Sequence, residues 1–89
     1  MEAIKIINAW INQAHEKKLY PFIKHFWIIR DLLEGLLHPE TTLFNETYIF
    51  LKNECKESDE RNLLIDELNK IFIKRQKEEK AEYTDQDLF

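Results

Sequence analysis

Very few residues of this chain are of the types that interrupt regular secondary structure. The 89 residues include one glycine and two prolines. Sandwiches and barrels of β-strands need many tight turns, and those turns use both residue types heavily. The shortage therefore favours a few long helices, with Pro21, Gly35 and Pro39 as the candidate positions for their ends.

Residues 2–18 are predicted to form an amphipathic helix. Its apolar residues recur at the spacing of one helical face, and they are Ile4, Ile7, Ile11 and Ala14, with Trp10 at the border. Pro21 ends this helix near Leu19 and Tyr20, because proline disfavours a helical conformation in the preceding residue. Proline also suits the first turn of the following helix, so a tight helix-helix connection is expected here.

Residues 21–38 are the most apolar segment and are predicted to form a central helix. Large apolar side chains cover much more than one stripe of it, namely Phe22, Ile23, Phe26, Trp27, Ile28, Ile29, Leu32, Leu33, Leu36 and Leu37. We therefore expect this helix to contact two or three other elements. Gly35 lies inside it, at a cost of about 1 kcal/mol relative to alanine. The glycine either permits close packing or marks fraying before Pro39.

Two further helices are predicted after Pro39. The first covers residues 41–56, with Thr41 or Thr42 as its N-cap. Its buried face is expected to consist of Phe44, Tyr48, Leu51 and Cys55, widened by Ile49 and Phe50. Ser58 is the expected N-cap of the last helix, whose first turn carries Asp59 and Glu60, where acids complement the helix dipole.

Together these elements predict an all-α protein with the architecture of a compact antiparallel bundle of about four helices. The chain is long enough for one domain with one core, assigned to residues 1–80, and residues 81–89 form a short acidic tail. Residues 77–80 provide no apolar anchor, so the last helix is expected to outrun the core. The main alternative is an irregular three-helix core from which the last helix projects.

The cysteine content and the hydropathy of the chain indicate its cellular location. Cys55 is the only cysteine, so no disulfide forms within the chain, and no apolar N-terminal run with a small-residue cleavage site is present. Charged residues interrupt every apolar stretch well short of the roughly 20 residues that a membrane helix needs. We therefore expect a cytoplasmic protein without a membrane span.

The polar residues form no pattern that is typical of catalysis or metal binding. His15, His25 and His38 are not paired at the spacing that places two imidazoles on one metal ion. Cys55 lies on a predicted apolar face, and the many acids are not accompanied by a glycine-rich phosphate loop or a Ser-His-Asp arrangement. We predict that the protein is not an enzyme and uses neither a cofactor nor a metal.

Aromatic residues are more numerous than one small interior needs. Nine of them lie within residues 10–72, and exposed aromatics inside a polar rim are the usual anchors of protein-binding sites. This surplus predicts a non-enzymatic, protein-binding regulator or inhibitor, with a homodimer as the simplest assembly. For any single ring, the alternative is an aromatic-rich core. The candidate partner-binding residues are Trp10, Tyr20, Trp27, Phe50, Leu88 and Phe89.

The tail has the composition of a short linear motif. Residues 83–89 are acidic and include Leu88 and Phe89 after two aspartates. Residues 85–89 resemble the pentapeptides that enter the bacterial sliding clamp, which begin with Gln and close with Asp or Ser, Leu and Phe. Asp85 stands where those peptides have Gln. The resemblance implies a docking segment, and folding of the tail onto its own bundle is the alternative.

Two other functions are weighed against protein binding. The row Lys70, Lys74 and Lys77, with Arg75 beside it, is typical of a helix that follows a phosphate backbone. The formal net charge of −4 opposes that use, so nucleic acid is the less favoured partner. Small size, helicity and acidity are also similar to those of intracellular immunity proteins of peptide bacteriocins, which is an analogy of architecture.

Overall fold

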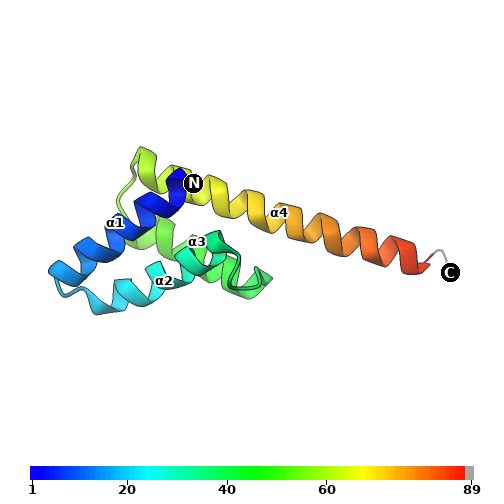
Figure 1. The fold of residues 1–89 in the computed structure, drawn as a ribbon, viewed down its shortest axis with the longest axis horizontal. Helices are drawn as coiled ribbons and strands as arrows, with labels where there is room; N and C mark the ends of the chain where they lie inside the picture. Colours follow the sequence, from blue (N-terminus) through cyan, green and yellow to red (C-terminus); the bar gives the residue numbers. More distant parts are fainter. Residues whose placement is uncertain (88–89) are drawn as a thin grey trace.

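Four α-helices make up nearly all of the part of the chain that the structure describes, as Figure 1 shows for this computed structural model. The backbone is described for residues 1–87 and the side chains for residues 1–75. The helices are α1 (Glu2–Glu16), α2 (Tyr20–Glu34), α3 (Thr41–Glu54) and α4 (Asp59–Asp87). Both α1 and α3 pack against α2 and α4, which confirms the predicted all-α bundle.

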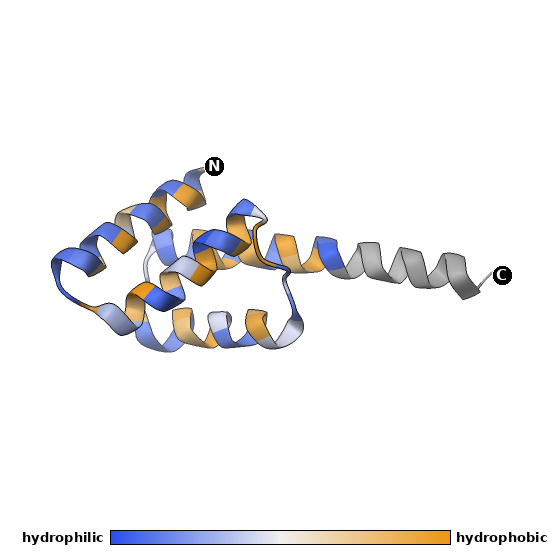
Figure 2. Ribbon diagram, turned by 60° about the horizontal axis from the view of Figure 1, so that its bottom comes forward, coloured by the Kyte–Doolittle hydropathy of each residue, from blue (hydrophilic) through white to orange (hydrophobic). Residues whose placement is uncertain are grey.

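Each helix contributes one large aliphatic side chain to the centre of the core. These are Ile7, Ile29, Leu51 and Leu64, none of which has appreciable solvent exposure. In α1 the buried positions are Ala3, Ile7, Ile11 and Ala14, which recur at intervals of three or four residues and so form one face. Figure 2 shows hydrophobic residues along this face of α1 and hydrophilic residues along its other side.

The last helix continues well beyond the core. Its buried apolar residues are Leu64, Ile65 and Leu68, followed by the half-buried Ile71 and by Phe72, which stacks on Phe44 with ring centroids 4.4 Å apart. The helix then runs on to Asp87 and projects from the bundle, so that the molecule measures 56 × 22 × 22 Å (Figure 1). The prediction that this helix outruns the core is confirmed.

Gly35 ends α2 earlier than the sequence predicts. Its φ of 79° lies in the left-handed region, and the Leu36 amide donates a hydrogen bond to the Asp31 carbonyl at 2.8 Å. With the bond from the Gly35 amide to the Leu32 carbonyl (3.3 Å), this is a Schellman cap. Gly35 is therefore a cap and not an interior residue, and Leu36 and Leu37, which were expected in the helix, lie exposed in the following loop.

The same cap ends α1 without a glycine. The Leu19 amide donates to the Ala14 carbonyl at 2.9 Å and the Lys18 amide to the His15 carbonyl at 3.2 Å. Lys18 supplies the left-handed residue, with φ of 58°. Because a side chain on a left-handed residue crowds its own backbone, this turn holds strain that the Gly35 turn lacks.

Helix α3 differs from the sequence expectation in its ends and its buried face. Glu40 is its N-cap, without a side-chain hydrogen bond, in place of Thr41 or Thr42. The buried face is a narrow stripe formed by Thr47, Phe50 and Leu51, and the residues between these positions point outward. Tyr48 and Ile49 are therefore exposed, although both were expected to be buried.

The expected N-cap of α4 is confirmed. The Arg61 amide donates a hydrogen bond to the Ser58 hydroxyl at 3.1 Å, which satisfies one of the free amides of the first turn. Among the described residues, no helix is both long enough and apolar enough to cross a membrane.

Replacement of Ile7 by alanine tests the core. Ile7→Ala removes a fully buried side chain, so we expect the free energy of unfolding in urea to fall by about 2–5 kcal/mol. Ile49→Ala is the matched control, because Ile49 is exposed on α3, and its effect should be within about 0.5 kcal/mol. Equal losses for the two variants would place Ile7 outside the core.

The two helix caps should respond to substitution in opposite directions. Gly35→Ala is expected to lower the free energy of unfolding by about 1 kcal/mol through backbone strain alone. No atom lies within 4 Å of the added Cβ, so steric overlap does not contribute. Lys18→Gly should raise stability by about 0.5 kcal/mol or less, because relief of strain is partly offset by the freer unfolded chain. Thermal or urea unfolding of both variants measures these changes. A loss of stability in Lys18→Gly would contradict the prediction.

Candidate functional site

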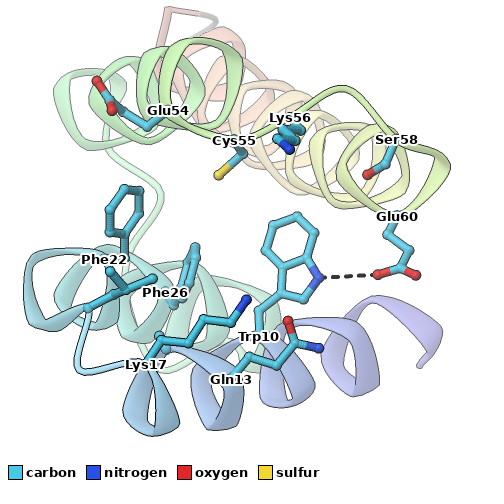
Figure 3. A pocket seen from close by; sticks show the side chains of 12 residues that line it. Trp10, Gln13, Lys17, Phe22, Phe26, Glu54, Cys55, Lys56, Ser58 and Glu60 are labelled. Carbon is cyan, nitrogen blue, oxygen red and sulfur yellow. Dashed lines mark hydrogen bonds between the residues drawn. The ribbon is translucent and has the colours of Figure 1, made fainter.

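An apolar groove opens between α1, the start of α2 and the connection from α3 to α4 (Figure 3). Its volume is about 400 Å³, which is within the usual range of roughly 300–1,000 Å³ for ligand sites. Its lining residues are Trp10, Gln13, Ala14, Lys17, Leu19, Phe22, Phe26, Glu54, Cys55, Lys56, Ser58 and Glu60. Side chains from both halves of the chain thus face one concave surface.

The turns on either side of the groove position its walls. The cap at the end of α1 places Leu19 against the groove, and Pro21 lies in the first turn of α2, so the chain reverses at once. Phe22 and Phe26 are one helical turn apart and therefore lie on the same side of α2. On the opposite wall, α3 ends at Glu54 and Cys55 continues in an extended conformation.

A layer of aromatic rings forms the floor of the groove. The Trp10 ring lies 5.6 Å from the Phe26 ring, and the Phe26 ring lies 6.2 Å from that of Phe22, measured between centroids. Phe50 contacts both phenylalanines at 5.6 and 5.8 Å and is only 7% exposed. Phe50 was expected both to widen the buried face of the third helix and to be a candidate partner-binding residue. The ring is buried against the two phenylalanines, as the first expectation has it, and its part in binding stays a prediction.

Trp10 also links the first helix to the last. Its indole Nε1–H donates a hydrogen bond to Glu60 Oε2 at 3.1 Å, shown as the dashed line in Figure 3. The half-buried indole also contacts the Phe26 ring, at an interplanar angle of 56°, so it is held by two residues. Trp10, one of the candidate partner-binding residues, is thus fixed in orientation at one end of the groove.

The charged residues of the groove are arranged unevenly. The side chains of Lys17 and Lys56 come from opposite walls, whereas Glu54 and Glu60 lie toward the two ends (Figure 3). Among residues with described side chains, neither lysine lies within ion-pairing distance of a carboxylate. Glu60 already accepts the bond from Trp10. Two unpaired cations therefore flank an aromatic floor.

Arg61 stabilises the groove wall that contains Cys55 through hydrogen bonds. Its guanidinium donates to the Cys55 carbonyl at 3.4 Å and to Asn62 Oδ1 at 3.3 Å, and the residue is 7% exposed. Cys55 is half-buried, and burial raises the pKa of its thiol, while the Arg61 charge opposes this shift. Cys55 was expected on the apolar face of the third helix, but it lies just beyond that helix and lines the groove.

The other candidate partner-binding residues are not among those that line the groove. Tyr20 is 62% and Trp27 45% exposed, and the Trp27 ring lies 6.3 Å from that of His15. Trp27 belongs to the most apolar segment, yet its side chain points away from the core. Leu88 and Phe89 lie outside the described residues.

The candidate nucleic-acid row lies on α4, and the structure describes the side chains of Lys70, Lys74 and Arg75. Lys70 Nζ lies 3.0 Å from Glu67 Oε1, so this cation is paired within its own helix. Lys74 and Arg75 are exposed and border a second hollow beside the loop after α2. The side chain of Lys77 is outside the described part of the structure. Binding of nucleic acid by this row stays a prediction.

Comparison of this chain with protein families, with curated proteins and with solved structures finds no match. In the described part of the chain, no three His, Cys, Asp or Glu side chains are grouped so that they could hold a metal ion. The groove combines apolar rings with two lysines that have no carboxylate partner among the described side chains.

Alkylation of Cys55 tests the environment of the groove wall. The raised pKa leaves less thiolate at any pH below it, so the folded protein should react with iodoacetamide more slowly than a peptide of residues 53–57. The pH midpoint of the reaction rate should be higher in the protein than in the peptide. By the same linkage, the contribution of this thiol to stability is present at neutral pH and lost as pH rises through the raised pKa. Identical midpoints in protein and peptide would contradict burial of the thiol.

Proposed function

We propose that this protein is a non-enzymatic regulator or inhibitor that binds another polypeptide in the groove between α1, α2 and the α3–α4 connection. The observation that carries the proposal is the aromatic floor formed by the half-buried Trp10 and Phe22 and the buried Phe26, bordered by charged side chains. Binding sites for protein segments have this composition, with aromatic anchors at the centre and a polar rim.

The groove is suited to a side chain or a short segment of a partner. Its aromatic rings are held by one another and by Glu60, so little conformational entropy is lost when a partner orders them. Gln13 and Ser58 at the rim supply hydrogen-bonding groups that fix the orientation of a bound backbone. The sequence predicts protein binding through exposed aromatic residues in general, and the proposal assigns this binding to one defined surface.

The residues that line the groove favour binding over catalysis. Cys55 is the only thiol, and burial raises its pKa, which lowers the fraction of nucleophilic thiolate at neutral pH. The groove lining includes no histidine that could act as a general base toward this thiol. We therefore propose a binding role in the cytoplasm, the location that the sequence predicts.

Chemical blocking of the groove tests the proposal. Because the chain has one cysteine, benzylmaleimide attaches a bulky group at Cys55 alone. We expect the modified protein to lose at least about tenfold in affinity for any protein that the unmodified chain captures from its source cells. Affinity is measured by titration with the captured protein after purification.

Two controls make the result decisive. The Cys55→Ser variant treated with the same reagent should bind as the untreated protein does, because no thiol is present to react. Ile49→Glu alters an exposed apolar residue of α3 that does not line the groove and should leave the affinity unchanged. Binding that survives the block at Cys55 but is lost in Ile49→Glu would move the contact surface to α3 and refute the proposal.

A further inference from the structure

The second half of α4 extends past the other helices of the described part of the chain. After Phe72 the helix continues to Asp87, and no other helix runs beside it (Figure 1). An isolated helix shorter than about 12–15 residues is marginal in water, because most helical stability comes from packing. A second polypeptide alongside this extension would supply the missing contact.

The groove lies beside the first turn of α4, and residues 83–87 form its last turns. Ser58 and Glu60 line the groove at the first turn of the helix, which then runs for about 40 Å to Asp87 at a rise of 1.5 Å per residue. Leu88 and Phe89 can extend the chain by only about 7 Å. While α4 is intact, these residues cannot enter the groove of their own chain.

A second copy removes this restriction. If two α4 helices lie antiparallel, the last turns of each are beside the first turn of the other, where the groove opens. A two-fold axis across the helix pair makes both contacts identical, so the assembly closes at two copies and does not grow into a filament.

The chemistry of the segment complements that of the groove. Residues 83–89 combine Asp85 and Asp87 with two large apolar residues, Leu88 and Phe89. The groove offers an apolar aromatic floor to the latter. To the former it offers the ammonium groups of Lys17 and Lys56, which have no carboxylate partner among the described side chains, whereas Glu54 and Glu60 lie toward its two ends. Charge pairs across an interface favour the correct partner and register.

We propose that the occupant of the groove is the 83–89 segment of a second copy of this chain, so that two copies exchange these segments across antiparallel α4 helices. The inference rests on the proposed function, because it assumes that the groove binds a polypeptide, and it names that polypeptide. Lys17 and Lys56 hold the aspartates, and the aromatic floor receives Leu88 and Phe89.

A charge exchange between two variants tests the proposal by sedimentation equilibrium at micromolar concentration. The wild type should be a dimer. Lys17→Glu with Lys56→Glu, and separately Asp85→Lys with Asp87→Lys, should each weaken self-association at least about tenfold, because like charges then face each other. An equimolar mixture of the two variants should restore the dimer, since each segment then meets a groove of opposite charge. The variant that combines Leu88→Ser with Phe89→Ser should be a monomer, and mixing it with either charge variant should not restore the dimer.

Four results would overturn the proposal. A wild type that is monomeric at these concentrations removes the second copy, yet the proposed function stands if blocking Cys55 still abolishes capture of a foreign protein. A dimer that persists in Leu88→Ser with Phe89→Ser shows that the helices pair without the segment. A monomer in which those two substitutions speed alkylation of Cys55 shows that the segment covers the groove of its own chain. Insensitivity of both dimerisation and capture to the block at Cys55 overturns the proposed function as well.

Discussion

The structure depends on one hydrophobic cluster, in which each helix buries one large side chain completely, namely Ile7, Ile29, Leu51 and Leu64. A small domain buries only a modest share of its surface, so the loss of one such side chain is poorly compensated elsewhere. The same packing brings α1, the start of α2 and the α3–α4 connection to one concave surface. The groove therefore depends on this cluster and on the short connections between the helices.

The parts of the fold that follow from local chemistry were predictable from the sequence. The helical spacing of Ile7 and Ile11 gave the buried face of α1, and Ser58 gave the start of α4. The buried face of α2 was harder to predict, because the apolar residues of this helix cover much more than one stripe. Their periodicity therefore does not distinguish the buried Phe26 from the exposed Trp27. Only the packing of neighbouring helices decides which of these adjacent rings is covered.

The candidate site was predicted less well than the fold, for a physical reason. Sequence analysis selects surplus aromatics, and of those selected Trp10 lines the groove whereas Phe50 lies beneath it. The remaining walls come from residues in turns, such as Lys17, Leu19 and Lys56, whose positions depend on how helices end. Gly35 illustrates the difficulty. A glycine at this place in the sequence is compatible with the interior of a helix or with its C-terminal cap, and only the positive φ in the structure identifies the cap.

The hydrogen bond between Trp10 and Glu60 joins residues 50 positions apart in the chain. During synthesis, therefore, the hairpin of α1 and α2 is complete long before its partner in α4 exists. Until residues 60–68 emerge, the aromatic floor and the apolar face of α1 remain uncovered on the nascent chain, in a form that attracts chaperones or neighbouring chains. The order in which the helices are made thus gives this small protein a period of exposure that its mature surface does not reveal.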